Sequence, residues 1–165
     1  MSETPTGWLR RAGRLDLGVG ETVLWSVAEG RRGRRWRSAR RDANGVLLAD
    51  LLLEVDSAGR WTRLELASAG GILTLHPEPH DTAVHGNVVT ERGVVPLVFG
   101  WSPGHCLVVE GEPVAAVALG RGRADASPAP GLHVTADLAV TAEEAIVEPA
   151  GSPDGLPGPS WPLEV

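Results

Sequence analysis

Short apolar runs separated by turn signals dominate the middle of this chain. Between residues 43 and 119 these runs show almost no helical periodicity, and a Gly or Asn stands at each reversal, as in Asn44-Gly45. Strands at such regular spacing predict an antiparallel sheet that closes or nearly closes. The predicted strands of this part are Val46–Val55, Trp61–Ala67, Ile72–His76, Ala83–Thr90, Val94–Trp101 and His105–Val109.

The flanking segments extend the same pattern. Upstream, Glu21–Ala28 and Arg34–Arg41 read as strands joined by a turn at Glu29–Gly33. Downstream, we predict strands at Val114–Leu119, His133–Val140 and Glu144–Glu148, with a flexible connection at Ala124–Gly131. No long segment has the periodicity of a helix. We therefore expect an all-β domain over residues 21–148, a single rolled sheet or barrel of about 9–11 strands. Residues 1–20 would be a flexible lead, and residues 149–165 a tail rich in Pro and Gly.

Composition indicates how many domains to expect and in which cellular compartment. The 165 residues suit one domain, and a hydrophobic content of 42% argues against global disorder. The single cysteine, Cys106, excludes an intramolecular disulfide and reads as a small buried thiol. No stretch resembles a signal peptide or a spanning helix, so we expect a cytoplasmic protein. Every basic residue is arginine, a bias typical of a GC-rich genome.

Positive charge is concentrated near the start of the chain. The net charge is −6, yet residues 1–41 hold ten arginines and four acids, and seven of these arginines fall within residues 31–41. Such a cluster suits a phosphate, a carboxylate or RNA, or a charged edge strand that prevents aggregation, which we favour slightly. Arg34, Trp36 and Arg40 share a strand face, which becomes an anion site if it points inward. The acidic remainder argues against nucleic-acid binding.

A rolled sheet of this size can hold one small ligand, and several residues suit its lining. In Val46–Val55 one face is apolar, whereas the other adds Asp50 and Glu54 to aliphatic residues, as in a cavity wall or a solvated face. His85 lies within an otherwise apolar run, which suits a pocket, an outer face or a tight turn. The tryptophans suit either ligand rings or the core. The candidate ligand-binding residues are Trp36, Arg40, Glu54, Trp61, Asn87 and Trp101.

Motifs for cofactors and nucleophilic catalysis are missing from the sequence. No phosphate loop, dinucleotide fingerprint or nucleophile elbow is present, so no cofactor is expected. The segment from His76 to Asp81, together with His85, contains metal-ligating residue types, but its two prolines favour a solvated loop over a metal site.

One family resemblance emerges from the order of the strands. The succession Arg35-Trp36-Arg37, Asn44-Gly45, Gly59 to Arg63, Leu73-Thr74-Leu75 and Gly93-Val94 resembles the glycolipid-binding family of bacterial spiral β-roll proteins, over roughly residues 22–120. The family's Thr-Asn-Thr-Leu-Pro stretch has no counterpart here, and His85-Gly86 takes its approximate place. The resemblance implies a rolled sheet with an apolar cleft, and no individual binding residue.

These patterns leave three functions open. The first is binding of a hydrophobic or amphiphilic small molecule, which requires shape and a few polar anchors. The alternative is a cofactor-independent enzyme of specialised metabolism, such as a cyclase, isomerase or dehydratase, with His85 and Asp50 as its acid–base residues and Glu54 and His133 as further proton carriers. Least favoured is a module that binds RNA or protein through Arg31–Arg41. We expect no membrane insertion, and open sheet edges suit a homodimer.

Overall fold

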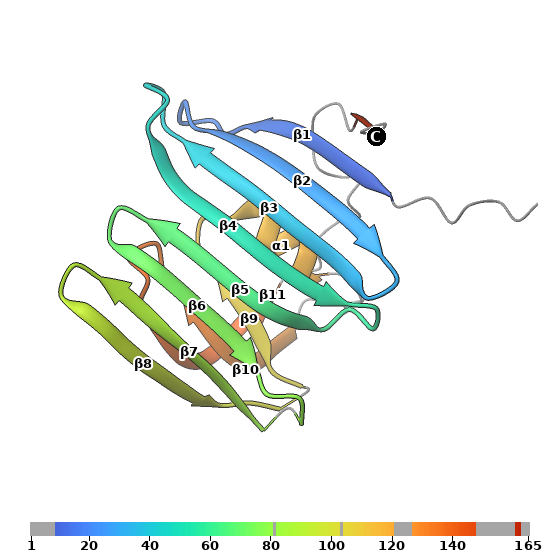
Figure 1. Cartoon of the computed structure of the whole chain (residues 1–165), viewed down its shortest axis with the longest axis vertical. Coiled ribbons are helices and arrows are strands. Elements are labelled where there is room, and N and C mark those ends of the chain that lie inside the picture. The colour runs from blue at the N-terminus through green and yellow to red at the C-terminus, as the bar shows by residue number, and fades with distance from the viewer. Residues whose placement is uncertain (1–8, 81, 103, 121–126, 148–160, 163–165) are drawn as a thin grey trace, which may run out of the picture.

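The computed structural model describes residues 9–80, 82–102, 104–120, 127–147 and 161–162. It is an all-β protein with one short helix, as Figure 1 shows. A nine-stranded sheet has the order β12-β1-β2-β3-β4-β5-β6-β7-β8, and a three-stranded sheet has the order β11-β10-β9. The strands of the large sheet are β1 (Arg10–Asp16), β2 (Thr22–Gly30), β3 (Gly33–Arg41), β4 (Leu47–Asp56), β5 (Trp61–Ser68), β6 (Gly71–Pro77), β7 (Ala83–Thr90), β8 (Gly93–Gly100) and β12 (Trp161–Pro162).

Neighbouring strands of the large sheet are all antiparallel, as the turn signals predicted. Two of the turns are closed by aspartates: Asp42 and Asp56 each accept two backbone N–H bonds from the residues that follow them. The expected closure is not found, since no described strand joins β8 to the opposite edge. The predicted all-β character and the antiparallel order of the large sheet are therefore confirmed, whereas the described strands form two sheets instead of one and no closed barrel.

One face of the large sheet forms the core. Alternation sends Val23, Trp25 and Val27 of β2 to this inner face, and register places Trp36 of β3 beside Leu53 of β4. These side chains are at most 6% exposed. The predicted core face of Val46–Val55 is also buried, except for Leu47, which is 44% exposed at the start of β4.

The small sheet and the helix cover this inner face (Figure 1). They comprise β9 (Cys106–Val109), α1 (Pro113–Gly120), β10 (Ser127–Val134) and β11 (Val140–Val147). The expected strand at Val114–Leu119 is thus wrong, because the segment is helical. Its residues are apolar on every side, so they show no periodicity, and Pro113 suits the first turn of a helix. Cys106 is buried, as expected.

Three further segments differ from expectation. β1 lies within the predicted flexible lead, and β10 begins within the predicted connection Ala124–Gly131. Strand β10 tolerates Pro128 and Pro130 because β9 pairs only with its second half, so the first half borders no described strand on that side. The predicted strand His133–Val140 instead comprises the end of β10, the hairpin turn at residues 135–139 and the first residue of β11, and Leu138 in the turn has a φ of 67°. Most of the predicted tail, residues 149–160 and 163–165, lies outside the described residues.

The far edge of the large sheet is strand β8. Thr90 and Gly93 close a two-residue hairpin, so hydrogen-bonded pairs alternate from there, and Pro96 falls at a position whose nitrogen points away from β7. Pro96 therefore leaves the ladder with β7 intact and removes a donor from the free edge. Within the described part of the chain, no helix has the length and hydrophobicity needed to cross a membrane.

Candidate anion-binding site

A tight turn between β2 and β3 presents two consecutive arginines. Gly30 pairs with Gly33, so Arg31 and Arg32 occupy the two loop positions. Gly33 has a φ of +127°, and a Cβ there would lie 2.0 Å from the carbonyl oxygen of Val55 on β4. Only glycine fits such close backbone contact, which fixes the base of the turn against the neighbouring strand.

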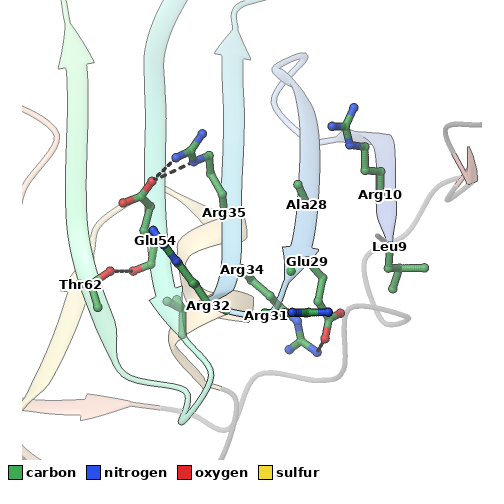
Figure 2. Close-up of a pocket in the computed structure, with 13 residues that line it drawn as sticks. Leu9, Arg10, Ala28, Glu29, Arg31, Arg32, Arg34, Arg35, Glu54 and Thr62 are labelled. Carbon is green, nitrogen blue, oxygen red and sulfur yellow. Dashed lines mark hydrogen bonds and ion pairs between the residues drawn. The ribbon is translucent and has the colours of Figure 1, made fainter. Parts of the chain in front are cut away.

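The turn borders a hollow of about 1380 Å³ at this end of the sheet (Figure 2). Its walls come from the start of β1, the β2–β3 hairpin, the end of β4 and the start of β5. The lining residues are Leu9, Arg10, Ala28, Glu29, Gly30, Arg31, Arg32, Gly33, Arg34, Arg35, Glu54, Val55 and Thr62. Five of these side chains are arginines and two are glutamates, so the hollow has an excess of positive charge.

Both glutamates of the hollow already form ion pairs with arginines of β3. Arg34 Nη2 lies 2.9 Å from Glu29 Oε1, and both Nε and Nη2 of Arg35 donate to Glu54 Oε1, at 2.8 and 2.7 Å. Figure 2 shows these pairs on opposite sides of the turn. They neutralise Arg34 and Arg35, and they leave no carboxylate of the lining available to the other arginines.

Three guanidinium groups of the hollow remain unpaired. Arg10, Arg31 and Arg32 are exposed, and none forms an ion pair or hydrogen bond with the part of the chain that the structure describes. Figure 2 shows Arg32 extending toward Glu54 and Arg31 toward Glu29. A guanidinium has five N–H donors in a planar fork that matches a carboxylate or phosphate. The arrangement can thus receive an anionic group from solution.

The expected inward-facing anion site is filled by the protein itself. Arg40 points to the inner face, where Nη1 lies 3.0 Å from Glu21 Oε2 and Nε lies 3.2 Å from Glu112 Oε1. Burial by itself lowers the pKa of Arg40, but the hydrogen bonds and charges of the two glutamates outweigh it and raise the pKa. Burial raises the pKa of Glu112 above its ordinary value, and Arg40 offsets only part of this effect. Arg40 therefore stabilises buried carboxylates.

The predicted ligand-binding tryptophans belong to the core. Trp36, Trp61 and Trp101 are 1%, 7% and 9% exposed, and the last two form an edge-to-face pair with centroids 5.4 Å apart. Within the described part of the chain, the indole N–H groups of Trp36 and Trp61 have no hydrogen-bond partner, and both groups are buried. The two rings therefore belong to the filled interior.

The remaining candidates lie on the outer face of the sheet and are spread widely. Asp50 and His85 are separated by three strand spacings, about 14 Å, across the sheet and by four residues, about 13 Å, along it. They therefore do not form an acid–base pair. His85 instead contacts Glu78 at 2.5 Å and stacks with His76. Asn87 pairs with Thr74, and of the predicted site residues only Glu54 lines the hollow.

The arginine cluster predicted from the sequence includes Arg31 and Arg32, but the candidate ligand-binding residues do not. Arg10 lies in the segment that was expected to be a flexible lead. A two-residue turn between strands excludes its side chains from both ladders, and that was the available signal. No group of three or more metal-ligating side chains comes together among the described residues. Comparison of the chain with family models, curated proteins and solved structures finds no match.

Proposed function

We propose that this protein binds a small amphiphilic molecule through an anionic group that Arg10, Arg31 and Arg32 hold in the hollow. The observation that supports the proposal is that three arginines line one hollow and form no ion pair or hydrogen bond with the described part of the chain. A bound anion gives these guanidinium groups the charge-assisted hydrogen bonds that they lack within the described chain.

The lining also supports an apolar part of the ligand. Leu9, which is 42% exposed, Ala28 and Val55 contribute to the same hollow as the arginines. A ligand that carries one anionic group next to an apolar chain satisfies both kinds of surface. The base of the turn is held against β4 through Gly33, so part of the ordering cost of binding is met before the ligand arrives.

Isothermal titration calorimetry with n-octyl phosphate, below its micelle concentration, tests this function. We expect saturable binding that weakens with salt, no binding of the neutral n-octanol, and a loss of about two- to five-fold in affinity for each of R10Q, R31Q and R32Q. Arg92 provides the matched control, because it is also an unpaired arginine in a two-residue hairpin, between β7 and β8. R92Q should bind as the wild type does. Equal affinities for R31Q, R32Q and the wild type would overturn the proposal.

A further inference from the structure

The outer face of β2 continues from the hollow as a line of small and apolar side chains. Alternation places Ala28, Ser26 and Leu24 on this face, which we call the β2 strip. Ala28 lines the hollow, and Leu24 lies four residues away, about 13 Å along the strand. Leu24 is 51% exposed, an unusual position for a large apolar side chain on a central strand.

Long side chains border the strip on both sides. Register places Arg10 and Arg35 on either side of Ala28, and Ala12 and Arg37 on either side of Ser26. Arg37 is exposed and forms no ion pair or hydrogen bond within the described part of the chain. The aliphatic stems of these arginines add apolar surface along the strip, while their charged ends remain in water.

We infer that the apolar chain of the ligand lies along the β2 strip, from Ala28 at the hollow toward Leu24, with its anionic group held by the turn arginines. This inference rests on the proposed function and specifies its ligand: a single-chain amphiphile with an anionic end. The head enters where positive charge is unpaired, and the chain covers the exposed apolar surface that adjoins it.

Two properties of the strip favour an alkyl chain over a polymer. β2 is paired with β1 and β3 along its length, so it offers no free backbone groups to a docking peptide, whose own N–H and C=O groups would lose water without replacement. The strip has no aromatic side chain on which nucleobases could stack. An alkyl chain needs neither hydrogen bonds nor stacking.

Calorimetry with n-butyl, n-octyl and n-dodecyl phosphate tests this path. Because one side of the alkyl chain would be buried against the strip, the affinity should rise about two-fold for each added methylene until the alkyl chain extends past Leu24. In L24T, which keeps a strand-compatible residue, we expect n-dodecyl phosphate to bind about three- to five-fold more weakly and n-butyl phosphate to bind unchanged. The matched control is I72T, because Ile72 is a similarly exposed residue, at 48%, on the same face of β6.

The outcomes separate this inference from the proposed function. Affinity that does not depend on chain length, or that responds equally to L24T and I72T, would overturn the path along β2, while dependence on Arg31 and Arg32 would still support the anion site. Absence of arginine-dependent binding for every alkyl phosphate would overturn both. Cosedimentation with vesicles of phosphatidylcholine and phosphatidylglycerol tests whether the protein binds a lipid surface instead of a single amphiphile. If vesicles compete with n-dodecyl phosphate and their binding is insensitive to L24T, the arginines recognise a lipid surface, and the single-chain assignment is wrong.

Discussion

Replacing Arg40 by methionine should destabilise the protein strongly at neutral pH and much less in acid. Arg40 is 14% exposed at its side chain and lies between Glu21 and Glu112, and the side chain of Glu112 is only 2% exposed. Methionine preserves most of the apolar stem but leaves Glu112 as a buried charge without a cation. Breaking a buried pair in this way costs about 3–5 kcal/mol.

The pH dependence follows from the pKa of Glu112. Burial holds this pKa above its ordinary value of 4.5, so the folded state binds the proton more tightly than the unfolded state. The stability that Glu112 contributes is therefore fully present below its unfolded pKa, and it is lost as the pH rises through the folded one. Without Arg40 the folded pKa rises further, and the loss becomes larger. In acid Glu112 is neutral in both proteins, and we expect the difference to fall to about 1–2 kcal/mol.

Urea unfolding followed by tryptophan fluorescence, at several pH values from about 3.5 to about 8, measures this difference. The double variant R40M/E112Q should recover most of the loss at pH about 8, because it removes the buried charge. R41M is the matched control: Arg41 is exposed on the same strand and, within the described part of the chain, donates only to the carbonyl of Gly45, so its loss should cost less than about 1 kcal/mol. A free-energy difference between R40M and wild type that stays constant across this pH range would refute the reasoning.

Three further predictions concern the turn, the hollow and the free edge. Gly33→Ala should cost more than about 2 kcal/mol in urea unfolding, whereas Gly93→Ala, with a similar φ of +120° but open space around its Cβ, should cost about 1 kcal/mol; equal costs would contradict the close contact with β4. Glu54→Gln should raise the calorimetric affinity for n-octyl phosphate about two- to five-fold, because it releases Arg35, and unchanged or weaker binding would argue against an anion site. Pro96→Thr should increase self-association in sedimentation velocity, because it adds a donor to the free edge, and an unchanged profile would show that Pro96 does not protect it.

Most of the large sheet could be predicted because its turns and its alternation are local. The strands of this sheet from residue 22 to residue 100 follow from apolar runs between short polar turns, and those segments contain enough residues of one face to show the period. β1 was not predicted as a strand, because two positions of its inner face are Arg11 and Gly13 and do not carry apolar side chains. A Cβ at Gly13 would lie 2.8 Å from the ring of Trp25, so the ring of this β2 residue occupies the space that a side chain at position 13 would need. Because the apolar group comes from the neighbouring strand, the sequence of β1 does not show the alternation of a half-buried strand.

The helix and the second sheet depend on tertiary contacts that the sequence does not display. α1 is buried on the inner face, so it lacks the polar side that marks a helix, and its residues Val114 and Ala115 are fully buried. In β10, Pro128 and Pro130 argue against a strand unless one edge is open, which depends on the length of β9. The predicted glycolipid-binding resemblance and the predicted homodimer stay predictions.

Strand geometry also explains why the two arginines of the β2–β3 turn need no partner within the described part of the chain. Among the seven arginines of residues 31–41, alternation directs Arg34 and Arg40 inward, where loss of water makes an unpaired guanidinium costly, and both have carboxylate partners. Arg31 and Arg32 belong to neither face of the sheet, so their guanidinium groups stay hydrated and need no carboxylate partner. Folding therefore requires the inward charges to be neutralised and places no such requirement on the turn. Charge that folding leaves unpaired is available for binding, so the anion site that we propose lies at the end of the sheet and does not involve the core tryptophans.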